Sequence, residues 1–280
     1  MPELPEIQAH AERLTEGWAG RQLAGFRPIT FTALKTARPH PDGAVGRPLD
    51  GVGRRGKHLL ARFGDLTFVV HLMQGGRLRP DERQSAKPRG GIARWTFADG
   101  TAWLLTEAGT ERKAGVWVLA GDTEGQPPLD GLGPDADVVA GDAAALGAVL
   151  AGHSARLHGV LRDQRVIAGI GRRLANEICH RATLSPFANA AKLKPDEVAL
   201  LAEAMASCLD ESLTYERSRD DMSSSKERPG EVHHREGETC PVCGDAVRAV
   251  EYVRYTVNYC ATCQTGGKVL ADNTTSKFLK

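Results

Sequence analysis

The sequence predicts an α+β protein, in which a β-rich N-terminal half precedes a helical half and a small cysteine-bearing hairpin. Short apolar or alternating segments separated by turns recur between Gln22 and about Ala120. Helical periodicity takes over from Asp142 to about Glu216. The 280 residues are enough for two domains, each with its own apolar core.

The N-terminal half begins with a helix and continues as strands. Residues Pro5–Ala19 place Ile7, Leu14 and Trp18 on one helical face, and Gly20 ends the segment. The strands expected next are His58–Phe63, Leu66–Leu72, Ala93–Phe97, Ala102–Thr106 and Val116–Leu119. Their spacing is typical of an antiparallel sandwich or barrel.

The segment from Gly121 to Asp142 contains five Gly and three Pro, so a domain boundary is expected there. The helices that follow are expected over Asp142–Leu150, Ser154–Gln164, Gly171–Arg181 and Pro195–Glu216, with Asp142 as a cap. Cys179 and Cys208 lie on inner helical faces and are expected in the core. The polar stretch Ser223–Arg235 is expected to be a mobile loop.

The formal net charge of +1 predicts no polyanionic partner by itself, but the charge is unevenly distributed. Ten basic and four acidic residues between Asp50 and Arg94 give a local excess of +6. Eight basic and two acidic residues between Ser154 and Lys194 give +6 again. Such segments are either solvated faces or the two sides of a polyanion site.

The chain has no apparent membrane or export segment. Its longest uncharged stretch, Ala143–Ala155, has 13 residues and is too short for a bilayer span. The first residues carry Glu3, Glu6 and Glu12 in place of a basic start, so a secretory signal is not expected. We therefore expect a cytoplasmic protein whose six cysteines are thiols or metal ligands.

A metal site is predicted near the C-terminus. Cys240 and Cys243 form one C-x2-C pair, and Cys260 and Cys263 form a second pair 16 residues later. Four thiolates at this spacing can bind one zinc tetrahedrally, with the alternating segment Val247–Val257 as the connecting hairpin. All four positions are ligands, so the metal would be structural and the chemistry must lie elsewhere.

The small residues of Ala168–Gly171 suit a turn between two helices. They would let the backbone N–H groups that open the second helix approach a phosphate, and arginines such as Arg162 and Arg172 flank this turn. The alternative is a tight connection without a ligand.

The first six residues, Met-Pro-Glu-Leu-Pro-Glu, suggest a nucleophile. Removal of Met1 would leave Pro2 as a secondary amine near a helix N-terminus, which favours its deprotonated form. Such an amine can attack C1′ of a sugar, and Glu3 could then protonate the opening sugar or the departing base. Alternatively, the two glutamates only complement the helix dipole.

Taken together, these motifs resemble the Fpg/Nei family of DNA glycosylases. The resemblance rests on Met1–Glu6, Gly53–His58, His71–Leu78, Gln164–Ile178 and the paired cysteines followed by Gln264. It implies an N-terminal β-sandwich with an N-terminal helix, and a C-terminal helix-two-turn-helix domain with a zinc-finger β-hairpin. The implied boundaries are 1–120 for the catalytic domain, 121–141 for a linker, 142–235 for the helical domain, 236–264 for the zinc finger and 265–280 for a tail.

By the same resemblance, Pro2 would be the Schiff-base nucleophile, Glu3 the proton donor at base release and Lys57 the proton donor for β-elimination. The base would be reached by flipping the nucleotide out of the stack. Arg112, Gly171, Arg172 and Arg254 occupy positions expected to contact DNA.

Several positions depart from the family pattern. Ala114 stands where an aromatic wedge is usual, and Gln74 where a methionine is usual unless Met73 takes its place. His158 replaces a lysine and Arg172 an asparagine. Tyr255 occupies the place of the zinc-finger arginine, so that Arg254 lies one residue away. His233 and His234 are expected at the surface or facing a phosphate and not at the zinc.

The resemblance implies a monomeric glycosylase and AP lyase that binds one structural zinc and damaged double-stranded DNA, and that is nucleoid-associated when bound. It favours oxidised or ring-opened purines as substrates. Two alternatives stay open: a preference for oxidised pyrimidines or bulky adducts, since Ala114 leaves more room, and a non-catalytic zinc protein that binds damaged DNA.

Overall fold

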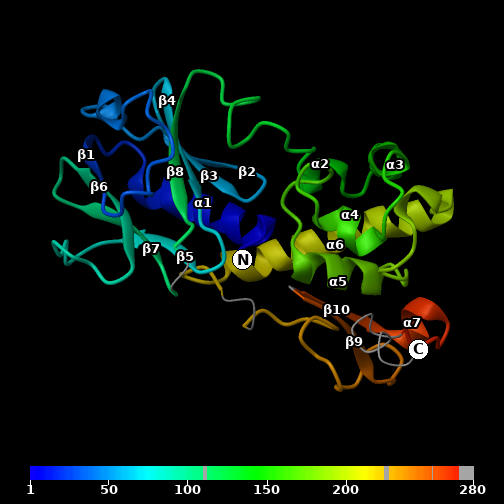
Figure 1. Cartoon of the computed structure of the whole chain (residues 1–280). Coiled ribbons are helices and arrows are strands. Elements are labelled where there is room, and N and C mark those ends of the chain that lie inside the picture. Colours follow the sequence, from blue (N-terminus) through cyan, green and yellow to red (C-terminus); the bar gives the residue numbers. More distant parts are fainter. Residues whose placement is uncertain (110–111, 224–226, 254, 271–280) are drawn as a thin grey trace. The chain divides into compact units, whose positions relative to one another are not determined.

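The structure of the chain is a computed structural model that describes residues 1–109, 112–223, 227–253 and 255–270. The chain forms two units (Figure 1). Unit 1 contains residues 1–2 and 6–131, and unit 2 contains residues 3–5 and 132–280. The short segment Glu3–Pro5 therefore belongs to the helical unit, although it lies at the other end of the sequence.

Unit 1 is built on two antiparallel four-stranded sheets (Figure 1). One has the order β1-β6-β7-β5, with bounds Leu23–Pro28, Gly91–Phe97, Ala102–Glu107 and Gly76–Pro80. The other has the order β2-β3-β4-β8, with bounds Gly51–Arg55, His58–Phe63, Leu66–His71 and Gly115–Ala120. The five strands expected from the sequence are present. The structure contains three further strands that the sequence did not predict, β1, β2 and β5. Their glycines and arginines interrupt the alternation of apolar and polar residues by which a strand is predicted.

Aromatic side chains join the two sheets into a sandwich. The ring of Phe26 in β1 lies 5.3 Å from that of Phe68 in β4, and Phe68 is 6.0 Å from Trp95 in β6. Phe68 and Trp95 are at most 1% exposed. Burial of these large rings supplies much of the apolar driving force for this unit. The prediction of a sandwich is thereby confirmed.

Helix α1 (Leu4–Trp18) contacts strands of both sheets. Trp18 packs 5.0 Å from Phe97 and 5.1 Å from Trp103, measured between ring centroids. The Thr15 hydroxyl accepts the backbone N–H of Val52 in β2 at 2.8 Å. These contacts fix the helix that begins two residues after Pro2.

Unit 2 is helical up to Arg217 (Figure 1). Its α-helices are α2 (Ala136–Val139), α3 (Ala143–Ala151), α4 (Leu157–Arg162), α5 (Arg172–Arg181) and α6 (Pro195–Arg217). Short 3-10 helices cover Pro41–Ala44 in unit 1 and Ala190–Lys192 in unit 2. The carboxylate of Asp142 caps α3, as expected, by accepting the N–H groups of Ala144 and Ala145.

Helix α4 is shorter than the sequence predicts. Its expected first residues, Ser154–Arg156, are not helical; Arg156 has an extended backbone and pairs with Asn189 in an antiparallel bridge. At the other end, Asp163 stops the helix, and its carboxylate accepts the N–H of Arg165. Cys179 and Cys208 lie in the apolar core of this unit, which confirms their predicted role.

The C-terminal part of unit 2 is a β-hairpin followed by a short helix. Strands β9 (Val247–Tyr252) and β10 (Tyr255–Cys260) pair in register, and α7 (Ala261–Thr265) follows directly. The side chain of Gln264 anchors this element to the helices, since its Nε2 donates to the carbonyl of Leu184 and its Oε1 accepts the N–H of Cys260.

Candidate functional site

The carboxylate of Glu3 is bound to the N-terminus of α5. Its Oε1 accepts the backbone N–H of Arg173 at 3.0 Å, and its Oε2 accepts that of Leu174 at 2.9 Å. The N-cap residue of this helix, Gly171, has no side chain that could cap it. Glu3 thus satisfies two of the donors that a helix N-terminus leaves unpaired.

Glycines in the loop between α4 and α5 make room for the N-terminal segment. A Cβ on Gly171 would lie 2.1 Å from Oε1 of Glu3, and a Cβ on Gly169 would lie 2.8 Å from the side chain of Leu4. The N–H of Leu4 donates to the carbonyl of Gly169 at 2.9 Å. The contact of Gly171 with DNA stays a prediction, since the helix N–H groups near it are bound to Glu3.

The side chain of Gln164 holds the same loop closed. Its amide nitrogen donates to the carbonyls of Arg162 and Ile170, and its amide oxygen accepts the N–H of Gly169. In the sequence, Gln164 stands only at the end of an expected helix and within the family motif. Its role depends on three contacts within a loop, and no periodicity in the sequence signals such contacts.

Pro2 directly precedes Glu3, so the anchored carboxylate limits where the proline can lie. Pro2 is buried, whereas Met1 is 43% exposed. The structure begins with Met1, and the secondary amine would form once Met1 is removed. Pro2 and Lys57 belong to unit 1 and Glu3 to unit 2.

Lys57 lies on the turn between β2 and β3, where the sequence placed it, and is 7% exposed. Two histidines flank it on neighbouring strands: the rings of His58 and His71 are 4.7 Å apart. Burial, followed by the nearby charge of Lys57, lowers the pKa of His71 to about 4. Burial, followed by the charge of His71, lowers the pKa of His58 to about 3. Both imidazoles are therefore neutral near pH 7, and Lys57 carries the positive charge of this turn.

The positions expected to contact DNA differ in their surroundings. Arg112 is exposed, and Arg172 is partly exposed at the first turn of α5. Arg254 lies outside the described residues. His158 is 2% exposed, and burial lowers its pKa to about 3, with a further contribution from Arg162. His158 therefore does not supply the positive charge of the lysine that it replaces.

The expectation of a surface position for His233 is wrong. His233 is 8% exposed and its Nδ1 lies 2.9 Å from the amide nitrogen of Asn176. The reason is Glu177, whose carboxylate accepts the backbone N–H groups of Glu231, Val232 and His233. This glutamate anchors the described residues of the expected mobile loop to α5. His234, in contrast, is exposed.

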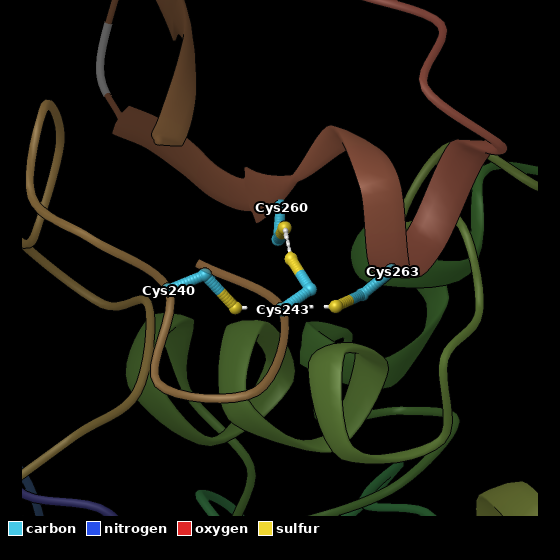
Figure 2. Close-up of side chains that lie close together, drawn as sticks. All are labelled: Cys240, Cys243, Cys260 and Cys263. Atoms are coloured by element: carbon cyan, nitrogen blue, oxygen red, sulfur yellow. Dashed lines mark hydrogen bonds between the residues drawn. The ribbon is translucent and has the colours of Figure 1, made fainter. Parts of the chain in front are cut away.

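Four cysteine sulfurs converge at the base of the hairpin (Figure 2). All lie within 4.8 Å of one another, and those of Cys243 and Cys260 are 3.3 Å apart. Cys240 and Cys243 come from the loop before β9, Cys260 ends β10 and Cys263 lies in α7 (Figure 2). The histidines of the preceding loop are not among these grouped ligands within the described residues.

The acid-base properties of these thiols fit a bound cation. Burial opposes ionisation of Cys240, yet the N–H groups of Cys243 and Val242 hold its pKa below the usual value. Burial and the adjacent sulfurs raise the pKa of Cys263. Four thiolates this close together repel one another, and a divalent cation would remove that penalty. A set of four cysteine sulfurs is typical of a structural zinc site.

None of the helices within the described residues combines the length and the apolar character that crossing a bilayer would require.

Two family models match the chain. Residues 1–115 match the formamidopyrimidine-DNA glycosylase N-terminal domain, and residues 132–224 match the formamidopyrimidine-DNA glycosylase H2TH domain. A formamidopyrimidine-DNA glycosylase of Thiobacillus denitrificans is 31% identical over 272 residues, which cover 94% of this chain and 100% of the relative. An uncharacterized formamidopyrimidine-DNA glycosylase-like protein of Mycobacterium tuberculosis is 46% identical over 159 residues, which cover 56% of this chain and 99% of that protein.

Solved structures share the fold. The Lactococcus lactis formamidopyrimidine-DNA glycosylase, non-covalently bound to DNA containing an AP site, aligns with a TM-score of 0.82 at 19% identity and covers 94% of this chain and 99% of its own. MutM in complex with DNA containing carbocyclic 8-oxo-G aligns with a TM-score of 0.81 at 18% identity, covering 94% of this chain and 100% of its own.

Proposed function

Because this chain belongs to the formamidopyrimidine-DNA glycosylase family, we propose that it is a DNA glycosylase of base excision repair that also acts as an AP lyase. Its substrate is damaged double-stranded DNA, and it acts as a monomer in the cytoplasm at the nucleoid. The observation that carries the proposal is the binding of the Glu3 carboxylate to the N-terminus of α5. This contact gives the extreme N-terminus, which in most proteins is poorly ordered, a defined place.

The chemistry follows from the secondary amine that Pro2 would expose. Its nitrogen attacks C1′ of the flipped nucleotide, the bond from C1′ to the base breaks, and the base leaves with a proton from Glu3. The Pro2 nitrogen then loses its proton as the C1′–O4′ bond breaks and O4′ takes up a proton, which leaves an iminium between Pro2 and C1′. A water molecule takes a proton from C2′, the C2′–C3′ double bond forms and the C3′–O bond to the 3′ phosphate breaks. Lys57 gives its proton to the leaving phosphate in this β-elimination. Water releases the opened sugar from the enzyme.

Zinc, when bound by the four cysteines, supplies structural stability and no open coordination position. The residues of the cluster would hold the hairpin in the conformation described above. Whether a second, δ-elimination follows depends on the zinc-finger region, where Tyr255 replaces the arginine of the family pattern.

Oxidised or ring-opened purines are the proposed substrates. The surroundings of Ala114 favour oxidised pyrimidines or bulky adducts as the second candidate. Ala114 is 2% exposed and its N–H donates to the carboxylate of Glu107 at 2.7 Å, so this position carries no projecting side chain. A panel of duplexes, each with a single lesion, tests the two candidates by the rate of base release.

A non-catalytic protein that binds damaged DNA is the remaining alternative. It is favoured by His158, which is neutral where the family pattern has a lysine. This alternative predicts salt-sensitive binding to duplexes without strand cleavage.

Borohydride trapping tests the proposed enzyme. With lesion-containing or abasic duplex, the mature protein should give a covalent adduct that maps to Pro2. A variant with an N-terminal tag, which places the Pro2 nitrogen in a peptide bond, should give none. Glu3→Gln should lose base release and keep some lyase activity at a preformed abasic site. A wild-type protein that binds DNA but gives no adduct on any lesion would refute the enzyme and leave the non-catalytic alternative.

A further inference from the structure

The guanidinium of Arg162 packs on the ring of Tyr255, which we call the aromatic platform. The carbon of its guanidinium lies 4.1 Å from the ring centroid of Tyr255, a distance typical of a cation–π interaction. Arg162 ends α4, whereas Tyr255 begins β10, about 90 residues further along the chain. The interaction thus fixes a cation of the helical domain against the cysteine-bearing hairpin.

The platform is itself supported by further stacking. Tyr255 stacks on Tyr252 with 4.7 Å between ring centroids, and on His158 with 6.1 Å. The hydroxyl of Tyr252 accepts a hydrogen bond from the guanidinium of Arg156 at 2.6 Å. These neighbours prevent the Tyr255 ring from turning freely, so Arg162 is held in one orientation before any ligand arrives.

A second arginine lies close to the first. Arg172 opens α5 just after the loop in which the amide nitrogen of Gln164 donates to the carbonyls of both Arg162 and Ile170, at 2.9 Å and 2.8 Å. In line with this arrangement, the charge of Arg172 adds to the larger effect of burial in lowering the pKa of Arg162. Among the residues that the structure describes, neither guanidinium forms an ion pair, and Nη1 of Arg162 is buried without an acceptor. Glu3 is a negative charge that acts on Arg162, but its carboxylate already accepts two backbone N–H bonds.

Within the described part of the chain, Arg162 thus has a buried N–H group without an acceptor, and a second cation, Arg172, lies beside it. An unpaired buried donor costs free energy, and an anion that bonds to both guanidiniums would remove this cost. Arginine is suited to a phosphate because its planar fork can donate two parallel hydrogen bonds. Since the proposed substrate is a polyanion, the anion of interest is part of its backbone.

We propose that Arg162 and Arg172 together bind one phosphodiester of the DNA substrate, and that Tyr255 positions Arg162 for this contact. The inference rests on the proposed function and assigns a binding role to a residue of α4. Tyr255 is a positioning residue, because it acts through the guanidinium that it supports.

Fluorescence anisotropy with the full-length, zinc-loaded protein tests the inference. The probe is a duplex with a tetrahydrofuran abasic-site analogue, which the lyase cannot cleave. Arg162→Gln should weaken binding about tenfold at moderate salt and reduce the slope of log K against log salt by about one. The matched control is Arg165→Gln, which removes the same charge from an exposed side chain already paired with Asp163. This control should change binding less than about twofold.

Variants of the platform separate positioning from charge. Tyr255→Phe keeps the ring and should bind like the wild type, whereas Tyr255→Leu should lose affinity without changing the salt slope as much as Arg162→Gln does. Arg162→Lys keeps the positive charge but lacks the planar guanidinium. Its slope of log K against log salt should equal that of the wild type, whereas its affinity for the duplex should lie between those of the wild type and Arg162→Gln. Melting temperature and zinc content are measured for each variant, so that a loosened hairpin is recognised.

The inference is overturned if Arg162→Gln and Arg165→Gln bind with the same affinity and slope, or if Arg162→Gln lowers only the melting temperature. It is also overturned if inorganic phosphate stabilises the wild type but not Arg162→Gln while DNA binding is equal in both, since the site would then bind free phosphate. A wild type that fails to bind the duplex would contradict the proposed function itself. Borohydride trapping of the wild type together with unchanged binding by Arg162→Gln would contradict only the inference.

Discussion

Gly171 is important because it has no side chain. Its conformation is extended and open to any residue, with φ of −114°. A side chain is excluded by Glu3, whose carboxylate occupies the space of a Cβ. The sequence alone predicts either a nearby phosphate or a tight connection between helices at this glycine. The structure shows that its smallness admits a carboxylate of the chain itself.

Gly171→Ala should therefore displace Glu3 from the helix N-terminus. We expect a loss of about 1 to 3 kcal/mol in the free energy of unfolding, since two buried donors lose their acceptor. Base release should fall with it, because Glu3 would no longer be held in place. Chemical denaturation and single-turnover base release measure the two effects.

Gly159→Ala is the matched control. Gly159 lies within α4, and a Cβ there would meet no atom within 4 Å. This variant should be as stable as the wild type or up to about 1 kcal/mol more stable, because alanine favours a helix. Equal stability of the two variants would show that Glu3 does not depend on Gly171.

At the scale of elements, strands β3 and β4 place two neutral histidines, His58 and His71, beside the lysine of the β2–β3 turn. The folded-state pKa values of His58 and His71, about 3 and about 4, lie below the ordinary value of 6.5. The unfolded chain therefore binds protons more readily than the folded chain below pH 6.5. Above pH 6.5 these two histidines do not reduce the free energy of unfolding. As the pH falls from 6.5 toward 4, the unfolded chain binds protons that the folded chain does not, and the free energy of unfolding decreases.

His71→Asn should reduce this pH dependence. The asparagine oxygen can still accept the N–H of Met73, which His71 Nδ1 accepts at 3.1 Å. Between pH 6 and pH 5 the unfolding free energy of the variant should change less steeply than that of the wild type, by up to about 1.4 kcal/mol per pH unit. Urea denaturation at several pH values measures the slope, and identical slopes would show that His71 does not titrate on unfolding.

The cysteine hairpin is the second element that makes a clear prediction. Its apolar contacts are few, so its conformation should depend on the metal. Removal of zinc with a chelator should lower the melting temperature and weaken duplex binding at least about tenfold, since the Tyr255 platform would lose its support.

Metal content tests the ligand set directly. The wild type should contain one zinc per chain, and the double variant Cys243→Ala with Cys263→Ala should contain none. The control is Cys208→Ala, which changes a core cysteine outside the cluster. One zinc per chain in the double variant would refute the assignment.

At the scale of the whole molecule, charge is distributed for a polyanion although the net charge is only +1. The two segments with local excesses of +6 supply cations in both units. Affinity for duplex DNA should therefore fall at least about a hundredfold between 50 and 200 mM salt, because bound phosphates release counterions. Anisotropy titrations measure this dependence. Affinity that does not change with salt would contradict electrostatic binding by these segments.

The sequence by itself determined the fold class, most of the strands and helices and the cysteine cluster. These features depend on local patterns: short apolar runs in β3 and β4, periodicity in α6, and the spacing of two C-x2-C pairs. The N-terminal motif also marked Glu3 as a candidate before its partner was known.

Only the tertiary structure decided what these residues contact. Glu3 meets Arg173 and Leu174 across about 170 positions of sequence, and Arg162 meets Tyr255 across about 90. No local pattern encodes such pairs, because contacts between distant segments arise only when the elements pack around a common core. The same packing neutralises His158 and buries His233, which a sequence presents as ordinary histidines.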